Sequence, residues 1–207
     1  CVAGDTYILT STGQHMIRDL VDKEVEVFNG LEFTRTTPRL TGRNAELLRV
    51  HLTNGTYIDC TPYHKFYVEA GGETFKVQAI DLKPDMALLH YDLPVLQLED
   101  RILYPYTHGI YCGLMSDNID VEDRCITMPL STYDKLKILI DGKGVVRPDS
   151  DIVEFTLPED FVDGHIVPMN CCIWDKMEWL SGFVDAAGLI LNGTDGPRMV
   201  VECDSIA

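Results

Sequence analysis

The segment RVHLTNGTYID, residues 49–59, is the feature that most narrows the folds open to this chain. Apolar and polar residues alternate on both sides of Asn54-Gly55, a pair that favours the two-residue type I′ turn, so the segment predicts a β-hairpin. Three further runs rich in β-branched and aromatic residues lie between turn residues: 6–10, 24–30 and 64–77. The first hundred residues therefore predict a mainly β domain, interrupted by one short helical turn at 15–20.

The sequence changes character around residue 100. Three prolines interrupt any long element on the way into the second half: Pro84, Pro94 and Pro105. Beyond them, apolar and small residues recur at helical spacing in 107–118 and in 171–188, which predicts two buried helices. We expect a domain boundary near residue 100, giving one domain over 1–100 and a second, α+β domain over 101–207.

The two predicted helices resemble each other. YCGLMSDNI and LSGFVDAAG each place a glycine third, and aligning Gly113 with Gly182 gives an offset of 69 residues. A strand-like run follows each of them, at 123–130 and at 198–206. A tandem repeat of a helix followed by a sheet is the economical interpretation.

Charge and hydropathy exclude several function classes. The 207 residues carry a formal net charge of −16, and in 101–207 eight basic residues face eighteen acidic ones. Neither half is built to hold a phosphate backbone by charge. No run of about eighteen apolar residues occurs and no signal-peptide pattern opens the chain, so we expect a cytoplasmic protein without a membrane span.

The cysteine pattern argues against a disulfide framework or a structural zinc site. The chain has seven cysteines: Cys1, Cys60, Cys112, Cys125, Cys171, Cys172 and Cys203. None is spaced as C-x-x-C or placed at zinc-finger distance from histidine. Most of them are therefore expected to be small, buried apolar residues.

The first group of candidate catalytic residues consists of Cys1 and the motif TPYH. A chain that opens with Cys in place of Met predicts that a leading segment was removed, or that the chain was once internal to a longer polypeptide. A thiol beside a scissile peptide bond attacks its carbonyl when a nearby donor protonates the departing nitrogen. Thr61 and His64 follow a predicted strand that ends at Cys60, so a tight turn would aim both side chains at one point; alternatively, His64 is a polar loop residue.

The residues of this first half resemble a known family. The opening CVAGDTYILTSTG, then HMIRDL and VEVFNG, and later NGTYIDCTPYHKFYV are similar to the two N-terminal splicing blocks of inteins, which have the Hint fold. The resemblance covers roughly the first 75 residues. It implies a β-rich Hint horseshoe in which Cys1 attacks the peptide bond preceding it and forms a thioester, while Thr61 and His64 strain and polarise that bond. No cofactor is implied for splicing, and Asp5 is expected to stabilise a turn.

The repeated helices resemble the LAGLIDADG motif of the homing endonucleases that are inserted in inteins. The resemblance implies close helix packing at small residues: Gly109, Gly113, Gly182 and Ala186. It also implies an acidic residue near each helix end that holds a divalent metal such as Mg²⁺. The family's acid falls at Ala187 in one motif and at Asn118, one position after Asp117, in the other, while Asp185 takes a packing or capping position. These replacements predict that DNA cleavage is lost, so that a DNA target site is ancestral and no metal is held.

The chain ends VECDSIA, and the last splicing blocks of the family, with their terminal His-Asn pair, are not found in it. We therefore expect an N-terminal intein fragment: either the N-terminal piece of a split intein, natural or engineered, or one stretch of a longer protein. Both need a C-terminal fragment to complete the Hint strands and flanking host segments to join. Two other functions stay open. An N-terminal-nucleophile hydrolase would use the amine of Cys1 as its base, and a non-catalytic binding module would leave Cys1 without a chemical partner.

Overall fold

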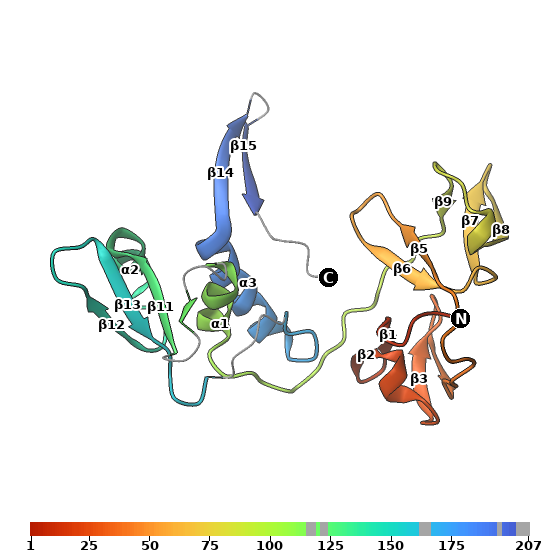
Figure 1. Ribbon diagram of the computed structural model, residues 1–207, viewed down its shortest axis with the longest axis horizontal. Helices are drawn as coiled ribbons and strands as arrows, with labels where there is room; N and C mark the ends of the chain where they lie inside the picture. The colour runs from red at the N-terminus through yellow and green to blue at the C-terminus, as the bar shows by residue number, and fades with distance from the viewer. Residues whose placement is uncertain (115–118, 121–123, 162–166, 194–195, 202–207) are drawn as a thin grey trace. The chain divides into compact units, whose positions relative to one another are not determined.

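A computed structural model describes residues 1–114, 119–120, 124–161, 167–193 and 196–201. The chain divides into two compact units, Cys1–Leu96 and Gln97–Ala207, where the sequence predicts a boundary near residue 100 (Figure 1). The first unit is built of strands and the second combines strands with helices, so the protein as a whole is mainly β. Among the described helices, none is both long and apolar enough to cross a bilayer.

The first unit contains three small antiparallel sheets. Its elements are β1 (Tyr7–Thr10), β2 (Gly13–Met16), η1 (Ile17–Leu20), β3 (Val25–Phe28), β4 (Phe33–Thr36), β5 (Leu48–His51), β6 (Tyr57–Cys60), β7 (Lys65–Ala70), β8 (Glu73–Gln78), η2 (Ala79–Asp81) and β9 (Ala87–Leu88). The sheet orders are β2-β1-β3-β4, β5-β6 and β8-β7-β9. Every run predicted as β in this half contains a strand, and the run 64–77 forms two, β7 and β8. The helical turn predicted at 15–20 is confirmed only for 17–20, because residues 15 and 16 belong to β2.

Alternation explains these strands and also shows how small the core is. In β7, Phe66 and Val68 are buried while their neighbours in the strand are exposed, as a two-residue repeat requires. Five apolar side chains of the first unit are buried: Leu20, Cys60, Phe66, Val68 and Ala79. Many larger ones remain open to solvent, so this unit buries little for its length.

The predicted hairpin is present, but its turn is not type I′. Strands β5 and β6 pair with His51 opposite Tyr57, and Leu52 N–H donates to Thr56 O at 2.9 Å. Gly55 has a positive φ of 86°, whereas Asn54 does not, and a type I′ turn needs both. The Asn54 side chain accepts hydrogen bonds from the N–H and the hydroxyl of Thr56, which favours a three-residue loop.

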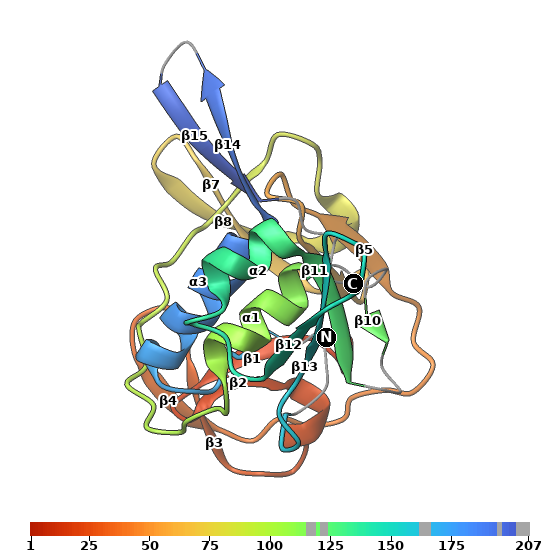
Figure 2. The ribbon, with the colours of Figure 1, turned by 90° about the vertical axis from the view of Figure 1, so that its left-hand side faces the viewer.

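The second unit packs helices against a four-stranded antiparallel sheet of order β10-β11-β13-β12. Its elements are α1 (Pro105–Gly113), β10 (Ile119–Asp120), β11 (Cys125–Pro129), α2 (Leu130–Leu136), β12 (Lys143–Val146), β13 (Ile152–Thr156), α3 (Ile173–Ala187), β14 (Gly188–Gly193) and β15 (Gly196–Val201). The core lies between α1 and the sheet: Ile110, Tyr111, Ile126, Met128, Val153 and Phe155. Figure 2 shows α1 and α3 side by side, with the β14–β15 hairpin extending away from them.

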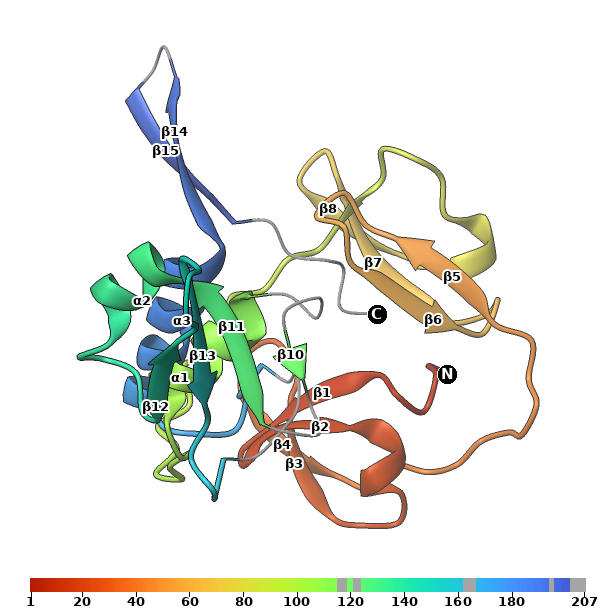
Figure 3. The same ribbon diagram turned by 60° about the vertical axis from the view of Figure 1, so that its left-hand side comes forward.

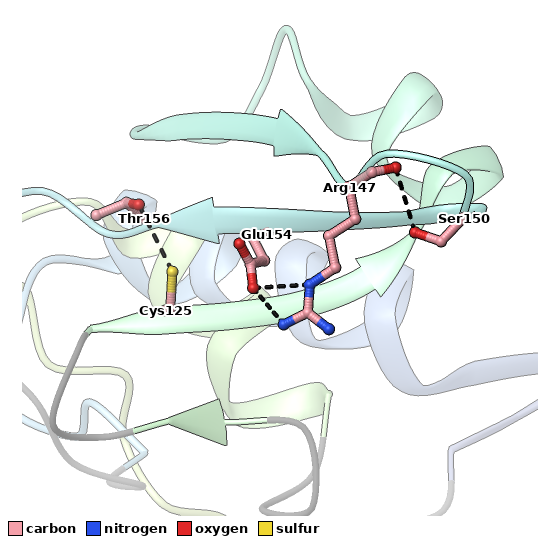
Figure 4. A network of polar contacts seen from close by, with 5 residues as sticks. All are labelled: Cys125, Arg147, Ser150, Glu154 and Thr156. Atoms are coloured by element: carbon pink, nitrogen blue, oxygen red, sulfur yellow. Dashed lines mark hydrogen bonds and ion pairs between the residues drawn. The ribbon is translucent and has the colours of Figure 1, made fainter.

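Two polar clusters fix the edges of this unit. On the sheet, Arg147 at the end of β12 pairs with Glu154 of β13, while Ser150 Oγ donates to Arg147 O at 3.3 Å and closes the turn between them (Figure 4). At the start of α3, the fully buried Asp175 carboxylate accepts hydrogen bonds from Arg101 at 2.9 Å and from Ile102 N–H at 2.8 Å. The second cluster ties the chain that enters the unit to its longest helix.

Candidate active site at the N-terminus

The first three residues extend the sheet edge beside β6. Val2 forms an antiparallel bridge with Cys60, and Ala3 N–H donates to Asp59 O at 2.8 Å. Thr61 N–H donates to Cys1 O at 2.9 Å, which places the first residue against the turn that follows β6 (Figure 3). Backbone hydrogen bonds alone are therefore enough to place Cys1 beside the TPYH motif.

The structure brings Cys1, Thr61 and His64 together, as the sequence predicts. The amine of Cys1 donates to Thr61 Oγ1 at 3.1 Å and lies 3.2 Å from His64 Nδ1. Thr61 is 2% exposed, so its hydroxyl has little competition from water. One nitrogen thus lies between a hydroxyl and an imidazole.

The turn that carries both side chains is held from two directions. His64 N–H donates to Thr61 O at 2.9 Å, which closes the turn on itself. On the other side, Ala79 N–H donates to His64 O at 2.7 Å and Ile80 N–H donates to Pro62 O at 3.0 Å, which joins the turn to η2. The imidazole also packs edge-on against the Phe66 ring at 5.1 Å. These contacts fix the direction of His64 without using its Nδ1 atom.

Burial is the main cause that lowers the pKa of His64, and the positive charge of the Cys1 amine lowers it further. The neutral imidazole is therefore favoured, and its Nδ1 lone pair can accept a hydrogen bond from the amine. If a residue preceded Cys1, the amine would be an uncharged amide and only the effect of burial would remain.

The thiol of Cys1 has a partner that the sequence does not reveal. Thr41 Oγ1 donates to Cys1 Sγ at 3.0 Å, and Thr41 lies in the loop between β4 and β5. Forty residues separate the two, and no motif or spacing marks this threonine.

Two acidic residues near the site, Asp5 and Asp59, have structural roles. Asp5 is exposed in the turn that Thr6 N–H closes on Ala3 O at 3.2 Å. Asp59 forms a two-pronged pair with Arg49 at 2.8 and 2.9 Å, and this hydrogen bonding lowers the pKa of Asp59. The pair braces β5 against β6 next to the point where the first residues join the sheet.

In the second unit, α1 and α3 contact each other backbone to backbone. A Cβ atom on Gly109 would lie 2.0 Å from Trp179 O, and one on Gly182 would lie 2.1 Å from Tyr106 O. A Cβ atom on Gly113 would meet the side chain of Ala186 at 2.8 Å. The close-packing role predicted for these small residues matches these contacts, because a larger side chain at either glycine would collide with a carbonyl oxygen.

The contacts across the helix pair are symmetric with a different offset from the predicted one. Gly109 of α1 contacts Trp179 of α3, and Gly182 of α3 contacts Tyr106 of α1. The two glycines are 73 positions apart in the sequence, and so are Tyr106 and Trp179. The alignment of Gly113 with Gly182, at 69 residues, is therefore wrong by one helical turn. Glycines four residues apart in α1 offer two alignments that differ by about one turn, and only packing selects between them.

This register changes which residues are equivalent. The counterpart of Ala187 is Leu114, a half-buried residue that packs against the core, so both positions are apolar. Asp117 and Asn118 lie outside the described residues. The exposed Asp185 accepts a hydrogen bond from Tyr106 at 2.6 Å, which links the two helices.

The described residues contain no group of three or more His, Cys, Asp or Glu side chains placed to hold a metal ion. None of the six described cysteines forms a disulfide, and Cys203 lies outside the described range. Burial was predicted for most of them, but only half of the six are buried: Cys60, Cys171 and Cys172.

Three known proteins that are similar to this chain are all named as subunits of ribonucleoside-diphosphate reductase. The chain is 37% identical over 225 residues to the ribonucleoside-diphosphate reductase large subunit of Invertebrate iridescent virus 6, a match that covers 98% of this chain but 23% of the viral protein. It is 32% identical over 104 residues to the ribonucleoside-diphosphate reductase NrdEB subunit alpha of Bacillus subtilis and to that of Bacillus phage SPbeta, covering 43% of this chain and 10% of each relative. No family model matches the chain. The chain thus spans less than a quarter of the length of these relatives.

Proposed function

We propose that this chain is the N-terminal part of an intein, with a Hint-type splicing domain in its first unit and a LAGLIDADG-type domain in its second. The observation that carries the proposal is the position of the Cys1 nitrogen, 3.1 Å from Thr61 Oγ1 and 3.2 Å from His64 Nδ1. With a residue joined before Cys1, that nitrogen would belong to the scissile amide. A hydroxyl and an imidazole would then already lie against the leaving atom.

The reaction that fits this geometry is an N-to-S acyl shift. Cys1 Sγ gives up its proton and attacks the carbonyl carbon of the preceding residue, so that a C–S bond forms. The C–N bond then breaks, and the proton lost by the thiol reaches the departing nitrogen through His64, so that Cys1 has a free amine. Protonation of the departing nitrogen by a positioned imidazole contributes about 10²–10⁴ in rate. Atoms balance without a cofactor, because the product is an isomer of the starting peptide.

The host of the intein is a ribonucleoside-diphosphate reductase large subunit in this proposal. The similarity covers 98% of this chain but 23% of the viral subunit. An element inserted into a longer catalytic chain would give that pattern, with the reductase itself formed by the residues on either side.

A C-terminal polypeptide would complete the first unit. The buried apolar residues there are few, while large apolar side chains remain exposed, among them Leu31 at 87% and Ile80 at 63%. Sheets of two and three strands leave unpaired edges that another segment can join. The partner we propose is therefore a β-rich fragment that adds strands to these sheets.

DNA cleavage is lost in this proposal. The resemblance puts the family's metal-binding acid at Ala187, and the symmetry of the helix pair puts its counterpart at Leu114. Neither side chain has an atom that ligates Mg²⁺. The residues present do not fit the metal, so we assign none, and incubation with Mg²⁺ and candidate DNA sites should give no double-strand cleavage.

The splicing proposal is tested with a reporter peptide joined before Cys1, in the presence of the proposed C-terminal fragment. Added thiol should release the reporter, and mass spectrometry should detect its thioester-derived end. Cys1→Ala should abolish the release, and His64→Ala should slow it by about a hundredfold or more. Release that is unaffected by Cys1→Ala would reject the acyl shift.

The names of the relatives favour a second candidate, in which these residues form part of the reductase body itself. The two functions leave different mature proteins. Splicing predicts a large subunit that lacks this segment and whose flanks are joined by a new peptide bond, whereas the second candidate predicts a subunit that keeps it. Peptide mapping of the mature subunit from the source organism separates them.

A further inference from the structure

Thr41, which lies outside the predicted site, contacts the thiol of Cys1. Its hydroxyl donates to Cys1 Sγ at 3.0 Å from the loop that joins β4 to β5. A thiol is a weak hydrogen-bond acceptor, and a thiolate is a much stronger one because it carries the full charge. A hydroxyl in this position therefore favours the form of sulfur that attacks carbonyls.

The loop that carries Thr41 is held on both sides. Three residues before it, Pro38 O accepts a hydrogen bond from Asp22 N–H at 2.9 Å, and Arg39 lies 3.6 Å from the Asp22 carboxylate. After it, the chain enters β5, where Leu48 pairs with Cys60. Contacts on both sides therefore restrict the loop that carries Thr41: before it to the turn between η1 and β3, and seven residues after it to β6.

The contact with Thr41 completes the immobilisation of Cys1. The nitrogen is held by Thr61 and His64, and Cys1 O accepts from Thr61 N–H at 2.9 Å. These bonds fix the backbone of Cys1 but leave its side chain free to turn about χ1. The bond from Thr41 selects one orientation of the sulfur, and a reacting group held in one orientation avoids the entropic cost of finding it.

We infer that Thr41 is a positioning residue for the nucleophile of the acyl shift, an inference that rests on the proposed splicing function. The hydroxyl keeps its own proton throughout. It orients Cys1 Sγ and stabilises the negative charge on sulfur until the C–S bond forms, and the transfer of the acyl group needs no co-reactant.

The test uses the reporter-extended chain with its C-terminal polypeptide and compares three variants over pH 6–9. Thr41→Val removes the hydroxyl at nearly constant shape, Thr41→Ser restores it, and Thr36→Val is the control on an exposed threonine of β4. We expect Thr41→Val to lower the thiol-induced release about tenfold at pH 7, the loss of one hydrogen bond to a charged group, and to move the pH–rate profile towards higher pH. Thr41→Ser and Thr36→Val should stay within about twofold of the parent.

Two outcomes would overturn this role: an unchanged rate and profile in Thr41→Val, or an equal loss at every pH that serine does not restore. Failure of the proposed function is recognised separately, because release would then be absent or independent of Cys1. A second measurement does not depend on splicing. Alkylation of Cys1 by iodoacetamide in the unextended chain should also shift to higher pH in Thr41→Val, and an unshifted alkylation profile would reject the bond to sulfur.

Discussion

The nitrogen of Cys1 lies 3.2 Å from Nδ1 of His64, so the charge of the amine acts on the imidazole. Burial lowers the pKa of His64 first, and the charged amine lowers it further. In the unfolded chain the imidazole is free of both effects, so acid protonates it there before it protonates the folded form. Protonation of His64 therefore lowers the free energy of unfolding as the pH falls below about 6.5.

Acetylation of the Cys1 amine should raise the pKa of His64 back towards its ordinary value, because it removes the second of these causes and leaves burial. An NMR titration of His64, assigned with a His64→Gln variant, measures the shift in acetylated and unmodified chains. An identical titration in the two chains would mean that the amine and the imidazole are not in contact in solution.

The carbonyl contacts of Gly109 and Gly182 predict large costs for small substitutions. Gly109→Ala and Gly182→Ala should each destabilise the second unit by about 3 kcal/mol, because the new Cβ atom meets a backbone oxygen that cannot move alone. Gly42→Ala is the matched control, since a Cβ atom there meets nothing within 4 Å, and it should stay within about 0.5 kcal/mol. Urea denaturation measures all three, and a neutral Gly109→Ala would contradict the backbone-to-backbone packing.

Asp175 predicts acid sensitivity in the second unit. Burial works to raise the pKa of Asp175, but hydrogen bonds from Arg101, Ile102 and Cys172 outweigh it and the pKa is lowered below 3.8. The carboxylate therefore stabilises the fold above about pH 4, and this stabilisation is lost as the pH falls through the folded pKa. Asp175→Asn should cost about 2 kcal/mol at pH 7 and progressively less below pH 4 in denaturation curves.

Glu154→Gln is the control for that experiment. Its pair with Arg147 is about half exposed on both sides, so solvent screens it and the expected cost is below about 0.5 kcal/mol at any pH. If both variants behaved alike, the buried pair would be no more important than the surface one.

The cysteines should differ widely in reactivity. Burial raises the pKa of Cys112 to about 11 and also raises the pKa of Cys60 and Cys171. Iodoacetamide at pH 8 should therefore modify the exposed Cys1 well before these three in the folded chain, as peptide mapping over time would show. Equal rates would indicate that the cores around the buried thiols open readily.

The sequence was most informative where local pattern and structure coincide. Alternation identified the strands around the hairpin, and the motif TPYH pointed to Thr61 and His64 because a turn after a strand aims neighbouring side chains together. Strands β2 and β4 were missed, since GQHM and FTRT alternate too weakly to be recognised. The turn type was wrong because the Asn54 side chain bonds to Thr56, which dipeptide preference does not anticipate.

Contacts between distant segments explain the other differences. Thr41 reaches Cys1 through the path of a loop, which no residue pattern encodes. The offset between α1 and α3 was wrong by one turn because either glycine of α1 satisfies the same motif, and the choice depends on which one fits against Trp179. Pattern therefore located the helices, and packing set their alignment.

The crossing of α1 and α3 makes some positions of these helices much less tolerant of substitution than others. Positions 109 and 182 have no room for a single extra carbon, so change there threatens the unit as a whole. The helix ends at 114 and 187 already carry side chains, leucine and alanine, and both positions are half-buried. The packing of the two helices therefore constrains the residues at their crossing far more tightly than the chemical character of the residues at their ends.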